Sequence, residues 1–250
     1  MNFKSSILNY HDYYTWQQDV TGFSSEAQDI LRNMTALVSR VGGLGGPLAF
    51  SLAAAGVGKI ILAHDGELRP DDLNRQILMK HEGLGKPRHE QAGETLRRFN
   101  PDLNIETIGE NIMESNVAKL IAQSDIVFAC APLFEERLLM NRECVSQNKF
   151  FVDTAMYNTE GQLLVVRPGE SACLACITPE PPLGWKRRFP VLGAVSAMMA
   201  QMGVLEGLKL LTGYAPAHTN TLMHMDTTNM DLRKIKIQRH PDCPHCSHLG

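Results

Sequence analysis

The sequence predicts an α/β fold built around a mostly parallel sheet. Two short apolar segments, 35–39 and 59–63, are separated by a glycine-rich turn at 40–46 and by a stretch at 47–56 whose apolar residues recur at helical spacing. A strand, a turn, a helix and a second strand in this order form a βαβ unit, in which the two strands run parallel.

The rest of the chain continues the alternation of helices and strands. Pro47 near the start and Gly56 just after the end bound the first helix, as is usual for helix termini. Further helices are expected at 85–100, 117–123, 134–147 and 192–211. Further strands are expected at 104–108, 125–130, 150–153 and 161–167, and in the alternating segment around Ile235 and Ile237.

Composition excludes several classes of protein. The chain has 24 Lys and Arg against 27 Asp and Glu, a net charge of −3, so binding to nucleic acid through bulk positive charge is not expected. No apolar stretch reaches the roughly 18–20 residues that span a bilayer without a charge or turn residue, so no membrane association is expected. The N-terminus lacks the basic and then apolar layout of a secretory signal. We therefore expect a cytoplasmic protein.

Four of the six cysteines form two CxxC pairs. One pair is Cys173 and Cys176, and the other is Cys243 and Cys246. Each pair places two thiolates on one tight turn, and four thiolates make a closed tetrahedral zinc site. The alternative is two unrelated redox or packing pairs. The remaining two, Cys130 and Cys144, stand in apolar or helical contexts typical of buried packing residues.

The glycine-rich turn is a candidate phosphate-binding loop. A turn of this kind between a strand and a helix presents backbone N–H groups to an anion at the helix N-terminus. The usual G-x-G-x-x-G pattern fits here in one register, with Gly42 and Gly45 as its second and third glycines and Arg40 in place of the first. The alternative is that the glycines serve only the steric needs of the turn.

Six motifs follow one another in a specific order. They are Gly42–Gly45, the segment Leu-Ala-Ala-Ala-Gly-Val-Gly at 52–58, Leu-Asn-Arg-Gln at 73–76, Gly-Lys-Pro at 85–87, and the two CxxC turns. Together they closely resemble the ThiF/MoeB/HesA family, the bacterial relatives of ubiquitin-activating enzymes, over about residues 22–246. The resemblance implies a doubly wound, Rossmann-like nucleotide-binding fold with a C-terminal zinc-bearing β extension, and a protein that dimerises. Family members use Mg-ATP to adenylate the C-terminal carboxylate of a ubiquitin-like sulfur carrier or peptide.

The resemblance assigns roles to matching positions. The residues expected to line the phosphates are Gly42, Gly43 and Gly45. Arg75 and Lys86 would neutralise the triphosphate, with Gln76 beside them, because charge builds on phosphorus and on the leaving pyrophosphate. The alternatives are a surface salt bridge from Arg75 to Asp71 or Asp72, and a solvated Lys86 at a helix start.

Several positions depart from the family pattern. The acidic residue that holds the ATP ribose falls on His64, and Asp65, one place along, is the expected substitute if the strand is locally irregular. The Asp that serves Mg-ATP falls on Pro132, which cannot ligate magnesium. The other substitutions are Asp72 for an Asn, Trp16 near the position of an arginine that the partner subunit inserts, and Lys186 for a loop cysteine.

These substitutions determine which reactions are expected of the protein. No cysteine lies between 177 and 242, so thioester or persulfide chemistry on the loop is not expected. Loss of the Asp at 132 would cost a factor on the order of a hundred or more in rate, which Arg40 is hypothesised to offset by clamping a phosphate. The basic, aromatic segment Trp185–Phe189 is expected to be a mobile loop that contacts an acidic partner such as a peptide, a phosphate or RNA, or is simply solvated.

Two functions fit the sequence. The first is an ATP-dependent adenylyltransferase acting on a carrier or peptide carboxylate without a loop cysteine. The second is a catalytically degenerate, zinc-stabilised scaffold that binds a ubiquitin-like protein or pairs with an active paralogue. A hydride-transferring dehydrogenase fits less well, because the first fingerprint glycine is absent. In either case we expect one domain, 1–250, with an N-terminal helical arm (1–35), a nucleotide-binding half (36–155) and a zinc-bearing, partner-binding half (156–250), forming a homodimer or heterodimer.

Overall fold

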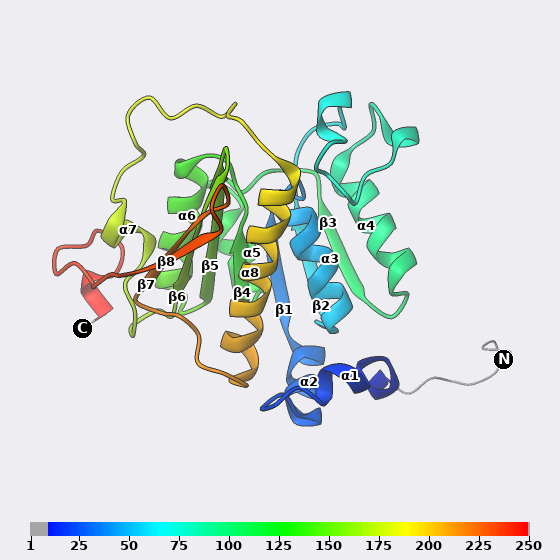
Figure 1. The fold of residues 1–250 in the computed structure, drawn as a ribbon, viewed down its shortest axis with the longest axis horizontal. Helices are drawn as coiled ribbons and strands as arrows, with labels where there is room; N and C mark the ends of the chain where they lie inside the picture. Colours follow the sequence, from blue (N-terminus) through cyan, green and yellow to red (C-terminus); the bar gives the residue numbers. More distant parts are fainter. Residues whose placement is uncertain (1–9, 250) are drawn as a thin grey trace, which may run out of the picture.

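The computed structural model describes residues 10–249, so part of the predicted helical arm, residues 1–9, lies outside the described residues. Its centre is one eight-stranded sheet in the order β3-β2-β1-β4-β5-β6-β7-β8 (Figure 1). The strands are β1 (Thr35–Ser39), β2 (Lys59–Ala63), β3 (Asn104–Ile108), β4 (Ile126–Ala129), β5 (Phe150–Tyr157), β6 (Glu160–Val166), β7 (Thr221–Asp226) and β8 (Asp231–Lys236). The first five are parallel and the last three join them antiparallel. The predicted α/β fold with a mostly parallel sheet is confirmed.

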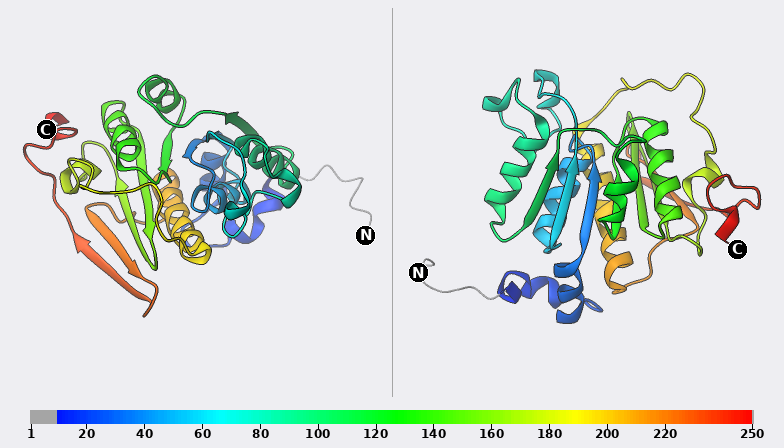
Figure 2. Two further views of the ribbon diagram at one scale, coloured as in Figure 1. Left: turned by 90° about the horizontal axis from the view of Figure 1, so that it is seen from above. Right: turned by 180° about the vertical axis from the view of Figure 1, so that it is seen from behind.

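Helices cover both faces of the sheet, as the view from above shows (Figure 2). They are α1 (Thr15–Gln18), α2 (Ser25–Asn33), α3 (Gly45–Ala55), α4 (Arg88–Phe99), α5 (Val117–Ala122), α6 (Phe134–Ser146), α7 (Leu174–Ile177) and α8 (Gly193–Thr212). Strand side chains alternate between two cores. Val38 packs with α3, α4 and α8 on one face, and Leu37 packs with α5 and α6 on the other. Period-two alternation with apolar residues on both faces is what a sheet buried on both sides requires.

Helix α8 packs close against the sheet because two of its positions that face the sheet, Gly203 and Gly207, are glycines without a side chain. A Cβ on Gly207 would lie 2.4 Å from the Phe128 ring, and one on Gly203 would lie 2.8 Å from Thr154. Within the described chain, α8 is the one helix long and apolar enough to cross a membrane, but just over half of it is buried against the protein. Its two charges, Glu206 and Lys209, pair with each other at 2.6 Å.

Strands β5 and β7 differ from the sequence expectation, and so do helix α7, which was not predicted, and strand β8, which ends before Ile237. β5 continues to Tyr157, four residues beyond the predicted end, because it pairs with β6 along its whole outer half. β7 was not predicted. Its segment carries the polar residues His224 and Thr221, and its strand conformation depends on pairing with β6 and β8 on either side.

The order of strands creates a switch point. From β1 the chain moves outward through β2 to β3 and then returns to the other side of β1 for β4 and β5. Ligands of open α/β sheets bind at such a point, in the crevice outside the carboxyl ends of the strands. The segment between α7 and α8, residues 178–192, passes over that end, while α1 and α2 lie at the opposite end (Figure 1).

Candidate nucleotide site and cysteine cluster

A cavity of about 1340 Å³ opens at the switch point. Its walls come from the segments that follow β1, β2 and β4, from the outer halves of β5 and β6, and from the loop before α8. The predicted site residues that line it are Arg40, Gly42, Gly43, Asp65, Arg75 and Gln76. Gly45 and Lys86 do not line it. Lys86 is exposed, and Arg88, which was not singled out from the sequence, lines the cavity instead.

The glycine turn bends tightly into the start of α3. A Cβ on Gly45 would lie 2.1 Å from the Arg40 carbonyl oxygen, and a Cβ on Gly43 would lie 3.0 Å from Arg75 Cγ. Arg40 has a φ of +64°, in the left-handed region that favours glycine, at the position where the fingerprint has its first glycine. The turn therefore keeps the backbone path of a phosphate-binding loop at a helix N-terminus, where the first N–H groups have no intrahelical acceptor.

The guanidinium of Arg40 is held by Glu136. Both side chains are buried, and Arg40 Nε lies 2.9 Å from Glu136 Oε2 with a second bond from Nη2 to the same oxygen. The charge of Arg40 is thus already neutralised. A phosphate clamped by Arg40 would have to compete with this carboxylate.

Asp72 organises the arginines on the opposite wall. This carboxylate is buried and lies 3.2 Å from Arg75, 3.6 Å from Arg88 and 4.0 Å from Arg69. Arg75 also donates to the Asp71 backbone carbonyl at 2.6 Å. Arg75 therefore forms the salt bridge to Asp72 that was the alternative to a phosphate-binding role, and it lines the cavity as well. Asp71 pairs with Arg69 as well, at 3.4 Å, so two carboxylates serve the three arginines of this wall.

His64 and Asp65 follow directly after β2, which ends at Ala63. Asp65 lies beyond the strand, so no irregularity within β2 is needed to bring it to the cavity, where its side chain is exposed. His64 is buried, and its burial, followed by the nearby charges of Arg88, Arg40 and Arg187, lowers its pKa to about 2. It is therefore a neutral imidazole at ordinary pH.

Three buried polar atoms at the cavity have no hydrogen-bond partner. Among the described residues, the buried side-chain nitrogen and oxygen atoms without a partner are His64 Nδ1, Gln76 Oε1 and His89 Nδ1. All three residues line the same cavity. An unpaired buried polar group costs about 1–3 kcal/mol, so native proteins rarely keep one without a reason. Their gathering at one place indicates a site built for a polar ligand.

The burial of His64 predicts a pH dependence of stability. Because its pKa is lower in the folded than in the unfolded state, the unfolded chain binds the extra proton below about pH 6.5, and stability falls as pH falls. At pH 4.5 this loss amounts to about 3 kcal/mol. His64→Gln should flatten the pH profile of urea denaturation between pH 4.5 and 7, whereas His81→Gln, an exposed control, should not. Identical profiles for His64→Gln and the unaltered protein would refute this account.

After β4, where the family pattern has an Asp, this chain has Pro132, whose only polar group is its backbone carbonyl. Pro132 follows β4, and its backbone oxygen accepts a bond of 2.8 Å from the Trp185 indole N–H. Beside it, Arg137 forms a buried bidentate pair with Asp153 at 2.8 and 2.5 Å. No acidic side chain projects from 130–132, so the residues here do not form a magnesium site.

Cys130 is the one cysteine among the described residues that line the cavity. Burial raises its pKa to about 12. The thiolate is the nucleophilic form of cysteine, and it is absent here at neutral pH. Cys130 therefore serves packing, as its apolar sequence context predicts.

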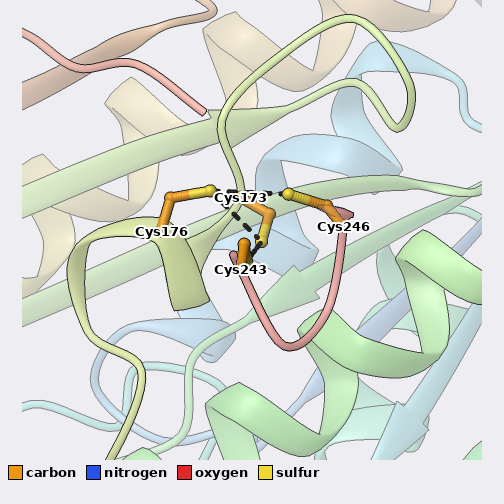
Figure 3. Close-up of side chains that lie close together, drawn as sticks. All are labelled: Cys173, Cys176, Cys243 and Cys246. Atoms are coloured by element: carbon orange, nitrogen blue, oxygen red, sulfur yellow. Dashed lines mark hydrogen bonds between the residues drawn. The ribbon is translucent and has the colours of Figure 1, made fainter. Parts of the chain in front are cut away.

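The four CxxC cysteines come together on the face of the sheet that carries α6 (Figure 3). The four sulfur atoms lie within 4.8 Å of one another, with Cys173 and Cys243 at 3.6 Å and Cys176 and Cys246 at 3.4 Å. Such a group could hold a metal ion. Asn141 of α6 bridges the two turns, accepting from the Leu174 N–H at 2.9 Å and contacting His245 Nδ1 at 2.8 Å.

Comparison with known proteins agrees with this geometry. The sequence profile of the ThiF family matches residues 14–245. The chain belongs to the ThiF family. It is 43% identical over 233 residues to "Protein HesA" of Leptolyngbya boryana, covering 93% of this chain and 84% of that protein. It is 29% identical to the "Sulfur carrier protein ThiS adenylyltransferase" of Escherichia coli K12, covering 96% of this chain and 97% of that protein.

Solved structures show the same fold. The crystal structure of E. coli MccB with MccA-N7isoASN superposes with a TM-score of 0.84 at 21% identity, over 96% of this chain and 75% of that one. The structure of E. coli MccB with ATP gives a TM-score of 0.79 over 88% of this chain and 69% of that one. The family predicted from the motifs and the Rossmann-like architecture of this ThiF-family chain are both confirmed.

Proposed function

We propose that this ThiF-family protein is an ATP-dependent adenylyltransferase that activates the C-terminal carboxylate of a ubiquitin-like sulfur carrier or a peptide. The observation that carries the proposal is the gathering of the three unpartnered polar atoms with the glycine turn and Arg75 in one cavity at the switch point. Relatives support it by name, since they include the ThiS adenylyltransferase and the "SAMP-activating enzyme E1" of Haloferax volcanii, 30% identical over 90% of this chain.

In the proposed reaction, a carboxylate oxygen of the substrate attacks the α-phosphorus of ATP. A bond forms between that oxygen and phosphorus, the bond from the α-phosphorus to the bridging oxygen breaks, and pyrophosphate leaves. Arg75, which overlies Gly43, is placed to neutralise the developing charge. Gly42 and Gly43 would bind phosphate through backbone N–H groups at the same turn, and Asp65 and the neutral His64, which line the cavity, would bind the ribose hydroxyls.

The proposal includes two metal ions, zinc and magnesium, and the chain provides ligands for zinc only. Four thiolates around one point suit zinc, which we propose as a structural ion held by Cys173, Cys176, Cys243 and Cys246. Magnesium would enter with ATP, without a carboxylate from the end of β4.

We propose that the protein acts in the cytoplasm as a dimer. Trp16, at the position of the inserted arginine, is 89% exposed on the arm and available for a partner.

The direct test is ATP–pyrophosphate exchange with candidate carriers and peptides. Exchange should require a free C-terminal carboxylate on the substrate and should disappear when that terminus is amidated. Arg75→Ala should slow exchange by about a hundredfold or more, because it removes a cation from the phosphates. Arg98→Ala, on the exposed side of α4 and paired with Glu94, is the matched control and should leave the rate unchanged.

A second function is favoured by two observations. Glu136 neutralises Arg40, and Pro132 stands where a carboxylate would serve Mg-ATP. Both features fit a catalytically degenerate scaffold that binds a ubiquitin-like protein or pairs with an active paralogue. No exchange with any carrier, together with no shift of the melting temperature by ATP, would contradict the adenylyltransferase and leave the scaffold.

A further inference from the structure

The loop between α7 and α8 is fastened over the cavity by aromatic side chains. Trp185 donates to the Pro132 carbonyl, and its ring lies 5.2 Å from Phe134, 5.8 Å from Tyr157 and 5.7 Å from Phe189. Tyr157 and Phe189 stack at 5.9 Å. Trp185 and Phe189 thus hold both ends of the basic segment. The sequence predicted a mobile loop here, but these contacts give it a defined place at the mouth of the site.

Most arginines that line the cavity are already paired with carboxylates. Arg40 pairs with Glu136, Arg137 pairs with Asp153, and the three arginines around Asp72 share that side chain. Within residues 10–249, no carboxylate forms an ion pair with Arg187 or Arg188, which line the cavity from the fastened loop. Both side chains are exposed, so their charges are available to a ligand.

Arg187 lines the same cavity as the three arginines around Asp72. Arg69, Arg75 and Arg88 pair with Asp71 or Asp72, whereas Arg187 pairs with neither. A cation without a counter-charge at the cavity favours an anionic ligand.

We propose that Arg187, from the loop, supplies a cation that binds the phosphates of ATP in this cavity. The inference rests on the proposed function, because it assumes that ATP occupies this cavity. The loop then links substrate binding to nucleotide binding, since it contacts the triphosphate through Arg187 and the outer half of β5 through Trp185 and Tyr157. Arg187 then carries part of the charge neutralisation of the phosphates.

The test is calorimetric titration of ATP and of adenosine into the purified full-length protein. Arg187→Ala should weaken ATP binding about tenfold or more, as expected for loss of a charge-assisted bond. It should leave adenosine binding unchanged, because adenosine lacks phosphates. Arg187→Lys should restore part of the loss. Lys186→Ala, the neighbouring exposed cation that does not line the cavity, is the matched control and should bind both ligands as the unaltered protein does.

The outcomes distinguish a failure of the Arg187 inference from a failure of the proposed function. Equal ATP affinity for Arg187→Ala and the unaltered protein would overturn this inference and leave the proposed function intact. Equal weakening of ATP and adenosine would also overturn it, because it would show that Arg187 only shapes the loop. Failure of the unaltered protein to bind ATP would contradict the proposed function and the inference with it.

Discussion

Asp153→Asn is expected to lower the free energy of unfolding by about 3–5 kcal/mol, because it leaves the Arg137 guanidinium buried without its counter-charge. The two side chains are 2% and 4% exposed, and two hydrogen bonds join them. Urea denaturation at neutral pH measures the change. The cost comes from the uncompensated charge and not from a large favourable energy of the pair itself.

A double variant provides the control for this prediction. Arg137→Met combined with Asp153→Val removes both charges and keeps the total side-chain volume closer to the original, so it should be clearly more stable than Asp153→Asn alone. It should also reduce activity, because Arg137 lines the cavity and lies over the Phe134 ring at 4.3 Å. A loss below about 1 kcal/mol for Asp153→Asn would show that water reaches the pair and that the pair is not buried in solution.

Cys243→Ser is expected to abolish metal binding and to unfold the C-terminal extension. A four-thiolate zinc site contributes on the order of 10 kcal/mol of binding free energy to folding, and this site ties the last turn of the chain to the turn at Cys173. Native mass spectrometry should find one zinc ion per chain in the unaltered protein and none in the variant. A strong chelator should lower the melting temperature of the unaltered protein only.

Cys144→Ala is the matched control for this variant. Cys144 is buried in α6, outside the cluster, so its replacement should keep the zinc ion and cost only a small packing term. Full stability of Cys243→Ser, or a purified protein without metal that is unaffected by chelator, would show that the four cysteines are packing residues.

The features predictable from sequence are those set by local pattern. The βαβ unit was found because 35–39 and 59–63 are apolar and the turn between them is rich in glycine. The cysteine cluster was found because a CxxC pair fixes two ligands on one turn whatever the surrounding fold. By contrast, β5 carries Asp153 within a buried strand, and a charge there is tolerated only because Arg137 from α6 reaches it. Such a pairing depends on tertiary structure.

Part of the candidate site could not be predicted for the same reason. The contact between Trp185 and Pro132 joins residues from a long loop and a strand end, and it depends on the path of the loop over the sheet. Arg88 lies two residues after Lys86, yet only Arg88 faces the cavity, because the chain enters α4 between them. The proline at 132 signalled that the family carboxylate is missing, but not that its carbonyl would anchor the loop.

The central claim is that ATP phosphates bind at the turn that starts α3, and hydrogen exchange of backbone amides tests it most directly. With millimolar ATP, peptides covering 40–46 and 64–76 should exchange more slowly, while α2 (Ser25–Asn33), at the opposite end of the sheet from the cavity (Figure 1), should not change. Unchanged exchange at 40–46 at that concentration, or slowing confined to other parts of the chain, would contradict the account.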